Sequence, residues 1–386
     1  MRTIGVVTGA RADYGLYLPI LKAVKSDPEL GLHLIVTGMH LSETFGHTID
    51  EIVAGGFEVN EKVDIALDAD TPVSITQSMG AALTKFGQAF SVVKPDILLL
   101  LGDRFEMFCA AATAMVFNIP VAHIHGGELT FGAIDDSFRH AITKLSHLHF
   151  VACETYAKRV IQLGEDPKRV IVSGAPGLDN VKQIELCSKK ELEQKFGLAL
   201  SEPPLLVTFH PVTLEYTETE KYFSALLAAL KELNKPVIFT APNADTGHRI
   251  LVNMIQEFIK VFNNAWLVES FGTQGYLSMM TYAEAMVGNS SSGVIEAASF
   301  ALPVVNIGTR QAGRMRGKNV IDVGYSAPEI IAGVQQATDP KFKESLAGLE
   351  NPLGDGTAAE KIIAQLKAAK LDQQLLMKIF YDLPKE

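Results

Sequence analysis

Cysteine is scarce in this chain, and basic residues are in deficit. There are three cysteines, and none belongs to a CxxC pair. That number is too small for a disulfide framework and forms no pattern typical of structural zinc. The 34 lysines and arginines are outnumbered by 44 acidic residues, which leaves a net charge of −10. This balance argues against nonspecific binding to nucleic acid or to an anionic membrane, so an anionic ligand must meet a local group of arginines.

Long apolar runs are absent as well. No segment is long enough to cross a bilayer, and residues Met1–Val7 predict a strand rather than a signal peptide. We therefore expect a cytoplasmic protein. With 386 residues, of which 47% are apolar and 20% charged, the chain has the composition of a globular protein. Its length suggests two domains, each large enough for its own core.

Strand-like and helical segments alternate along both halves, which is typical of parallel sheets covered by helices. The strands predicted in the first half are Thr3–Thr8, His33–Thr37, Ile97–Leu101, Val121–Ile124, His149–Ala152 and Arg169–Val172. Those predicted after the prolines at 203 and 204 are Leu205–Phe209, Pro236–Thr240, Trp266–Val268, Ala285–Val287, Pro303–Asn306 and Asn319–Asp322. The helices include Leu16–Ser26, Val294–Phe300 and Ala358–Lys370. We expect an α/β fold of two doubly wound, Rossmann-like domains that face a central cleft, where the strand ends bind the ligand.

Ionisable side chains gather where two predicted strands of the first half end. They belong to Gly102–Glu106 (GDRFE), His123–Glu128 (HIHGGE) and a predicted helix with Asp135, Asp136, Arg139 and His140 in its first turns. Half of the ten histidines fall within residues 98–150. The two aspartates also suit the positive end of a helix, and the spacing from Asp135 to Arg139 permits an ordinary ion pair. The concentration of titratable groups at strand ends nevertheless indicates an active site.

Loops in both halves have residues suited to a diphosphate. Thr8–Gly15 (TGARADYG) joins a strand to a helix and includes Arg11, but it is not the GxGxxG pattern of a dinucleotide site. Gly288–Ser291 (GNSS) places small hydroxyl groups where a strand meets a helix, and Glu296 in that helix could hold a ribose diol. The next strand is followed by Gly308–Arg314. Serines at a helix start are often plain N-caps, but together these loops favour a nucleoside diphosphate.

The same loops resemble those of the hydrolysing UDP-N-acetylglucosamine 2-epimerases. The motifs occur in the family's order from Thr8 to about Gly356, across nearly the whole chain. They are Thr8–Gly15, Gly38–Leu41 (GMHL), GDRFE, HIHGGE, Asp135–His140 (DDSFRH), Phe209–Pro211 (FHP), Pro242–Gly247 (PNADTG), GNSS and Gly308–Arg310 (GTR).

This resemblance implies a glycosyltransferase-B architecture, with a C-terminal helix that crosses back onto the first domain. We place the N-terminal catalytic domain at residues 1–182 plus 366–386 and the C-terminal, UDP-binding domain at 183–365. The partners implied are UDP-N-acetylglucosamine and UDP, in a homo-oligomer that is a dimer or, more often in the family, a tetramer. We expect no cofactor and no metal.

The family reaction eliminates UDP from C1 with loss of the C2 proton, and water then adds to the 2-acetamidoglucal. UDP-N-acetylglucosamine thereby becomes N-acetylmannosamine, the sialic-acid precursor, and UDP. This chemistry needs acid–base groups near C2 and cations near the leaving diphosphate. The catalytic residues predicted are Asp103, His125, Glu128, Asp135, Arg139 and His210. The residues predicted to bind UDP or the sugar are Arg11, Asp13, Arg104, Asn243, Ser290, Ser291, Glu296 and Arg310.

One position departs from part of the family. Where some members have HIEGGE, this chain has His125, which leaves the identity of the C2 base open. The candidates include His125, Glu128 just beyond the two glycines, and Asp103 at the end of the neighbouring strand. HIHGGE also resembles the related epimerases that act on nucleotide-linked 2,4-diacetamido-2,4,6-trideoxyhexoses in the legionaminic-acid route, which is the alternative substrate. A glycosyltransferase-B sugar transferase and a non-catalytic nucleotide-sugar sensor remain open as other classes. The carboxylates and histidines of the first half favour the epimerase.

Overall fold

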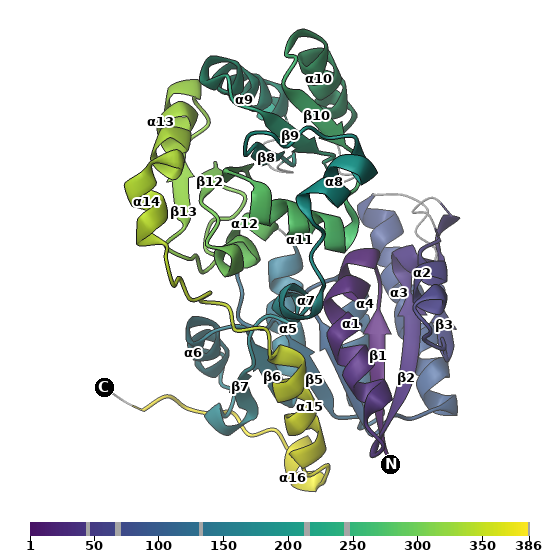
Figure 1. Cartoon of the computed structure of the whole chain (residues 1–386). Coiled ribbons are helices and arrows are strands. Elements are labelled where there is room, and N and C mark those ends of the chain that lie inside the picture. Colours follow the sequence, from purple (N-terminus) through teal and green to yellow (C-terminus); the bar gives the residue numbers. More distant parts are fainter. Residues whose placement is uncertain (44–46, 66–70, 131–133, 212–216, 243–247, 385–386) are drawn as a thin grey trace. The chain divides into compact units, whose positions relative to one another are not determined.

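The computed structural model describes the chain except for residues 44–46, 66–70, 131–133, 212–216, 243–247 and 385–386 (Figure 1). It divides into two compact units. Unit 1 comprises Met1–Leu129, Ala133–Asn180 and Leu353–Glu386, and unit 2 comprises Thr130–Gly132 and Val181–Pro352. No helix among the described residues is long and apolar enough to span a membrane.

Unit 1 contains a seven-stranded sheet in the order β3-β2-β1-β4-β5-β6-β7, with parallel pairing throughout the described part. The strands are β1 (Arg2–Thr8), β2 (Leu30–Thr37), β3 (Glu61–Val63), β4 (Ile97–Leu101), β5 (Val121–Ile124), β6 (Leu148–Val151) and β7 (Val170–Val172). The helical segments are α1 (Arg11–Ser26), η1 (Gly38–Leu41), α2 (Ile49–Ala54), α3 (Pro72–Val92), α4 (Phe105–Val116), α5 (Ile134–Leu145), α6 (Glu154–Gln162), η3 (Pro167–Arg169), α15 (Ala358–Ala368) and α16 (Gln373–Leu376). Helix α7 (Gly177–Gln183) contains the boundary between the units.

Unit 2 repeats the arrangement with a six-stranded sheet in the order β10-β9-β8-β11-β12-β13, again parallel in the described part. Its strands are β8 (Leu205–Thr208), β9 (Val237–Thr240), β10 (Ala265–Val268), β11 (Ala285–Gly288), β12 (Val304–Ile307) and β13 (Val320–Val323). Its helical segments are α8 (Lys189–Phe196), α9 (Thr219–Leu233), α10 (His248–Val261), α11 (Gly272–Tyr282), α12 (Ser291–Ile295), η5 (Ala297–Phe300), α13 (Ala327–Thr338) and α14 (Pro340–Ser345). The predicted α/β fold of two Rossmann-like domains is confirmed.

Strand β4 shows why apolar runs become central strands. All five of its residues are buried. Ile97, Leu99 and Leu101 face a core shared with α1 and α15, whereas Leu98 and Leu100 face a second core shared with α3 and α4. A parallel strand covered on both faces needs apolar side chains at every position, because alternate residues point to opposite faces.

The C-terminal helix α15 returns to unit 1, as predicted from the resemblance. Ile362 and Leu366 of α15 are buried in the same core as Tyr17 and Leu21 of α1. The sequence-based boundary between residues 365 and 366 falls inside this helix. In the structure the whole of α15 belongs to unit 1, because the chain rejoins that unit at Leu353.

Candidate active site

Arg139 is the centre of a polar cluster at the ends of β4 and β5. Its guanidinium is buried, and Nη2 forms an ion pair with Asp103, which lies two residues beyond β4. Nη1 donates to the main-chain oxygen of His125 at 3.0 Å and lies 3.9 Å from Glu128 Oε2. Four of the six predicted catalytic residues therefore lie together around one cation.

Helix α5 aims Arg139 at this edge of the sheet. Arg139, Ile142 and Thr143 form its buried face, with the three- and four-residue spacing of one side of a helix. Asp135 and Asp136 occupy the first turn, where negative charge complements the helix dipole. The possible surface ion pair between Asp135 and Arg139 is not the arrangement observed, because Arg139 turns inward to Asp103.

His125 and Glu128 form a hydrogen-bonded dyad. Nδ1 of His125 lies 2.7 Å from Oε1 of Glu128, and both side chains are nearly buried. The chain reverses sharply between them, with a φ of +67° at His125 and +77° at Gly127. A Cβ at Gly127 would come 2.4 Å from the carbonyl oxygen of Tyr156, so this turn requires glycine. A left-handed histidine is uncommon and costs conformational energy, which the surrounding contacts must offset.

His123 is buried within β5, two residues before His125. Its Nε2 donates to the main-chain oxygen of Gly102 at 2.8 Å, and its Nδ1 lies 3.2 Å from Thr143 Oγ1. Burial lowers the pKa of His123 to about 3, so the ring is neutral at physiological pH. This residue thus connects the end of β4 to α5. His123 belongs to the HIHGGE motif, but this role was not predicted.

Asp135 differs from Asp103 in its surroundings. Burial raises the pKa of Asp135, and the neighbouring charge of Asp103 adds to the effect, while Arg104 and Arg139 oppose it. Asp136 faces His140 instead, at 3.5 Å. A carboxyl group with a raised pKa is better able to hold a proton near neutral pH, which suits a general acid.

A second buried group contains Asp13, Arg104 and Glu106. Arg104 donates to Oε1 of Glu106 at 3.1 Å and to the sulfur of Met39 at 3.5 Å. Burial raises the pKa of Asp13 to about 6, against the opposing charge of Arg104. Within the described residues, Asp13 Oδ2 and Glu106 Oε2 have no hydrogen-bond partner. Glu106 was not among the predicted site residues, although its place in GDRFE was a signal.

Arg11 lies apart from these clusters. It is the first residue of α1, its side chain is exposed, and its Nε is 3.2 Å from Glu51 Oε2 of α2. This helix was predicted to start at Leu16, but it begins at Arg11, so Arg11 and Asp13 are helical rather than loop residues. Their predicted contact with UDP or sugar remains a prediction.

Asn289 joins three strand-end loops of unit 2. Its side-chain oxygen accepts from the main-chain N–H of His210 at 2.7 Å, and its Nδ2 donates to the carbonyl of His210 at 2.8 Å. The carbonyl of Asn289 accepts from Arg310 at 3.0 Å and from Gln311 at 2.9 Å. The loops after β8, β11 and β12 are thereby tied together. Asn289 was not predicted as a site residue; its signal was an amide placed directly after a buried strand.

Gly288 allows this loop to pass close to β8. Its φ is +136°, and a Cβ there would lie 1.9 Å from the carbonyl oxygen of Thr208. Ser290 caps α12 by accepting from the N–H of Ser292 at 3.4 Å, and Ser291 begins the helix. Both predicted serines therefore lie at the carboxyl edge of the sheet of unit 2.

Glu296 directly follows α12 and is partly buried. The structure corrects the single helix predicted for 294–300, because Glu296 lies at the junction of α12 and η5. Burial raises its pKa to about 7, and its Oε2 has no hydrogen-bond partner within the described part of the chain. Burial also raises the pKa of Tyr276 to about 12, against hydrogen bonds with Thr208, Ser292 and Ser290. Tyr276 was not among the predicted site residues.

His210 belongs to the loop group of unit 2 rather than to the cluster around Arg139. Burial lowers its pKa to about 3, and the nearby charge of Arg310 adds to the shift. The predicted site residue Asn243 lies outside the described residues. No group of three or more histidines, cysteines and acids suited to a metal ion occurs where the structure describes the chain.

The family model for UDP-N-acetylglucosamine 2-epimerase matches residues 22–367. The chain belongs to this family. It is 40% identical over 385 residues to a protein of Campylobacter jejuni named GDP/UDP-N,N'-diacetylbacillosamine 2-epimerase (hydrolyzing), with 99% of each chain covered. It is 38% identical to UDP-N,N'-diacetylbacillosamine 2-epimerase (hydrolyzing) of Legionella pneumophila, with 98% of this chain and 99% of the relative covered.

Solved structures of the family have the same fold. The crystal structure of UDP-GlcNAc 2-epimerase from Neisseria meningitidis bound to UDP-GlcNAc has a TM-score of 0.81. The match covers 96% of this chain and 100% of that chain, at 20% sequence identity. The predicted family is thus confirmed, and membership supports an enzyme with 2-epimerase activity.

Proposed function

We propose that this protein is a hydrolysing 2-epimerase of a nucleotide-linked 2,4-diacetamido-2,4,6-trideoxyhexose, with UDP-N,N'-diacetylbacillosamine as its preferred substrate. The products are the free sugar inverted at C2 and UDP. The observation that carries the proposal is the full-length similarity to two relatives with that named activity, at 40% and 38% identity.

UDP-N-acetylglucosamine is the second candidate substrate. Its support is a Neisseria meningitidis relative named UDP-N-acetylglucosamine 2-epimerase, which is 34% identical over 338 residues. The Neisseria structure, whose title names this sugar nucleotide as the bound ligand, bears on the fold alone at 20% identity. Both sugars have an acetamido group at C2, so the same elimination applies to each.

In the proposed elimination, the C2 proton moves to a base while the bond from C1 to the diphosphate breaks. The electrons of the C2–H bond form the C1=C2 double bond, and UDP leaves with those of the C1–O bond. We assign the base to His125, because a hydrogen bond from Nδ1 to Glu128 leaves Nε2 as the acceptor of the neutral ring. Glu128 then stabilises the imidazolium that forms.

In the proposed hydration, C2 receives a proton from the opposite face of the sugar and water adds to C1. We assign the returning proton to Asp135, whose raised pKa lets it hold one near neutral pH. Asp103 accepts the proton that the attacking water loses. Arg139 holds Asp103 and the dyad in register through the contacts described above.

We assign the nucleotide to the loops of unit 2. Ser290, Ser291 and Arg310 bind the diphosphate, and the guanidinium offsets the charge that develops on departure. Glu296 binds the ribose hydroxyls. His210, tied to Asn289, shapes the same loop and orients the diphosphate rather than exchanging the sugar proton. In this assignment Arg11, Asp13 and Arg104 contact the sugar end of the substrate.

The homo-oligomer is also part of the proposal. Val73, Val92, Met115 and Val116 expose apolar side chains on α3 and α4, which pack against each other. Exposed apolar residues on neighbouring helices are typical of subunit interfaces. Light scattering of the purified protein should give a multiple of the 41.8 kDa chain, and a monomer would contradict this part of the proposal.

The substrate is tested by turnover of the two UDP-sugars, measured separately in deuterium oxide. We expect kcat/KM to be at least about tenfold higher for UDP-N,N'-diacetylbacillosamine, since loss of one well-used polar contact costs about 1.4 kcal/mol. NMR should show the free manno-configured sugar with deuterium at C2. The GDP-linked sugar, tested in parallel, shows whether the protein prefers UDP or GDP as the nucleotide.

The outcomes separate the alternatives. A higher kcat/KM for UDP-N-acetylglucosamine would replace the proposed substrate by the second candidate. A product without deuterium at C2 would contradict elimination and hydration for either sugar. Tight binding of the nucleotide sugar without turnover would indicate a non-catalytic sensor. Turnover that depends on an added sugar acceptor would indicate a sugar transferase.

A further inference from the structure

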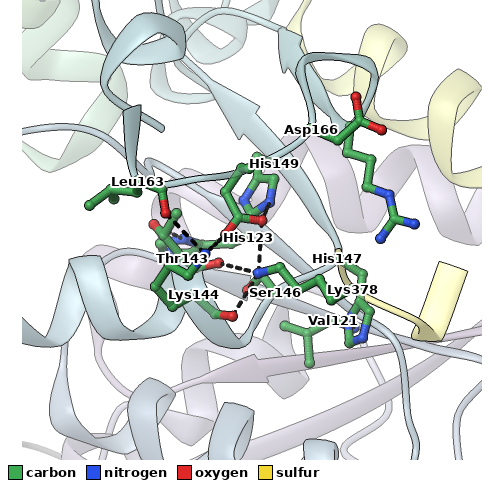
Figure 2. A network of polar contacts seen from close by, with 12 residues as sticks. Val121, His123, Thr143, Lys144, Ser146, His147, His149, Leu163, Asp166 and Lys378 are labelled. Carbon is green, nitrogen blue, oxygen red and sulfur yellow. Dashed lines mark hydrogen bonds and ion pairs between the residues drawn. The ribbon is translucent and has the colours of Figure 1, made fainter. Parts of the chain in front are cut away.

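Glu165 is the hub of a polar network with Lys144, His149 and Lys378, the three partners that are labelled in Figure 2. Its Oε1 accepts from Lys144 at 2.6 Å, and its Oε2 accepts from Lys378 at 2.7 Å and from His149 at 3.0 Å. Burial opposes a charge on this carboxylate, but the hydrogen bonds outweigh it and lower the pKa of Glu165 to about 2. Such a network is costly to desolvate, and nothing in the proposed chemistry uses it.

Lys378 uses all three of its ammonium hydrogens. Besides Glu165, it donates to the main-chain oxygens of Lys144 at 2.6 Å and Thr143 at 3.2 Å. These two carbonyls belong to the last turn of α5, and that of Thr143 also accepts from the main-chain N–H of Ser146 at 3.1 Å. A cation there gives both carbonyls a charged donor and complements the helix dipole. Lys378 is therefore a cap for α5, supplied from a distant part of the sequence.

The tail segment, residues 373–381, is anchored on both sides of Lys378. Arg169 donates to the carbonyls of Leu375 at 2.9 Å and Gln374 at 2.7 Å. Beyond Lys378, the N–H of Tyr381 donates to Gly164 at 2.9 Å. The ring of Phe380 covers Gly164 so closely that a Cβ there would come within 2.3 Å of it. These contacts hold Lys378 in place over the end of α5.

A continuous path leads from this cap to the candidate catalytic residues. Thr143 Oγ1 donates to the carbonyl of Arg139 one turn earlier, at 3.0 Å, and lies beside His123. His123 in turn holds Gly102, which precedes Asp103. A shift of the last turn of α5 would therefore displace both Arg139 and Asp103, the two partners of the ion pair.

We propose that Lys378 is a positioning residue for the epimerisation: by capping α5 it holds Arg139 against Asp103 and the His125–Glu128 dyad. The proposal rests on the proposed function for its activity readout alone. The tail segment then belongs to the catalytic apparatus of unit 1, although it touches no substrate.

The charges around Lys378 make the role dependent on pH. The groups that face it are Glu165, Lys144, Arg169, His147 and His149. Burial lowers the pKa of Lys378 to about 8, and Glu165 opposes the shift. Burial also lowers the pKa of both histidines, that of His147 to about 4, so neither titrates in the same range. Above about pH 8 the ammonium loses a proton and one of its three donated bonds.

The test compares Lys378→Met and Lys378→Arg with the control Lys370→Met, an exposed lysine near the tail segment. We expect Lys378→Met to lower kcat at pH 7.5 by at least about tenfold, with KM and UDP affinity within about twofold of the unmodified protein. The unmodified protein should lose kcat above about pH 8. Lys378→Arg should restore part of the turnover and abolish that alkaline loss, since a guanidinium stays charged. Lys370→Met should behave like the unmodified protein.

Hydrogen exchange of residues 142–147 supplies a readout independent of any substrate. Exchange should speed up in Lys378→Met, and in the unmodified protein between pH 7 and 9 after correction for the intrinsic rate. If Lys378→Met does not fold, the pH dependence of exchange in the unmodified protein still tests the proposed capping role. Unchanged exchange, normal kcat in Lys378→Met, or a parallel loss of UDP affinity would overturn the proposal. If no nucleotide sugar is turned over, the proposed function fails, while the exchange result still tests the capping role.

Discussion

The two units share one topology and differ in what they place at the strand ends. The order β3-β2-β1-β4-β5-β6 in unit 1 corresponds strand for strand to β10-β9-β8-β11-β12-β13 in unit 2. At the ends of β4 and β5, unit 1 has charged and titratable groups paired around Arg139. At the ends of β8 and β11, unit 2 has an amide and hydroxyl groups held by main-chain contacts. The fold provides the edge, and the residues decide whether that edge moves protons or holds a ligand.

The difference also appears in how buried charge is treated. In unit 1, the carboxylate of Asp103 is balanced by Arg139, a costly arrangement in a desolvated place. In unit 2, Glu296 forms no ion pair within the described residues, and its pKa is raised. We infer that unit 1 pairs its charges where the chemistry is proposed, whereas Glu296 in unit 2 can accept or donate a hydrogen bond to a polar ligand.

The largest effect is expected from Asp103→Asn in unit 1. Asparagine accepts no proton and leaves the buried Arg139 without its carboxylate, so turnover should fall by roughly a hundredfold or more. UDP affinity, measured by calorimetry, should not change, because the nucleotide is assigned to unit 2. Asp136→Asn is the control, since Asp136 faces His140 instead. Near-normal turnover in Asp103→Asn would remove Asp103 from the mechanism.

A comparable loss, about a hundredfold, is expected from His125→Ala and from Glu128→Gln. Because the two side chains act as one hydrogen-bonded dyad, the double variant should be hardly worse than either single variant. Turnover of all three variants at saturating substrate gives the coupling free energy between His125 and Glu128. Independent, multiplying losses would show that His125 and Glu128 have separate roles.

Arg310→Ala should instead affect binding, which sharpens the contrast between the units. Loss of a charge-assisted contact to the diphosphate should weaken UDP binding by about 1.5–3 kcal/mol, or roughly 10- to 100-fold. Lys318→Met removes the same charge from an exposed position eight residues further on and should have little effect. Unchanged UDP affinity in Arg310→Ala would contradict the assignment of the diphosphate to this loop.

Much of this fold follows from local sequence, but parts depend on distant contacts. Strand β4 was predicted with its observed bounds because Ile97–Leu101 is a continuous apolar run. Strand β3 was missed, since its three residues include two charged ones and its place depends on pairing with β2. The start of α1 was placed too late because Arg11 and Asp13 suggested a loop.

The candidate site shows the same limit. Asp103, His125, Glu128 and Arg139 were found from strand ends and motifs, and the structure brings them together. The hydrogen bond between His125 and Glu128 could not be predicted from local sequence, because it requires a positive φ at a histidine. The contacts of Asn289, Tyr276 and Glu106 join residues far apart in the chain or depend on burial, so composition and spacing did not reveal them. The catalytic and binding roles remain predictions.

A smaller effect, on stability, is expected from Glu296→Gln in unit 2. Burial raises the pKa of Glu296 to about 7 from an ordinary value of 4.5, so between these values the folded protein binds more protons than the unfolded chain. Stability must therefore decrease as pH rises through that range, by about 3 kcal/mol from this group. Urea unfolding at several pH values should show a shallower decrease for Glu296→Gln. Glu257→Gln, at an exposed position, should keep the original slope, and an unchanged slope in Glu296→Gln would refute the shift.

No effect at all is expected from exhaustive chelation of divalent metal ions. The leaving diphosphate needs positive charge, and we assign that task to Arg310, whose guanidinium already lies at the loop edge on the carbonyl of Asn289. The histidines of HIHGGE are engaged elsewhere: His123 contacts Gly102 and Thr143 through its two ring nitrogens, and His125 contacts Glu128 through Nδ1. Turnover should therefore be the same before and after dialysis against EDTA, and unchanged by added Mg²⁺ or Zn²⁺. If turnover is lost on chelation and restored by one of these ions, a metal ion and not Arg310 offsets the charge of the departing UDP. The proposed role of Arg310 in unit 2 would then be wrong.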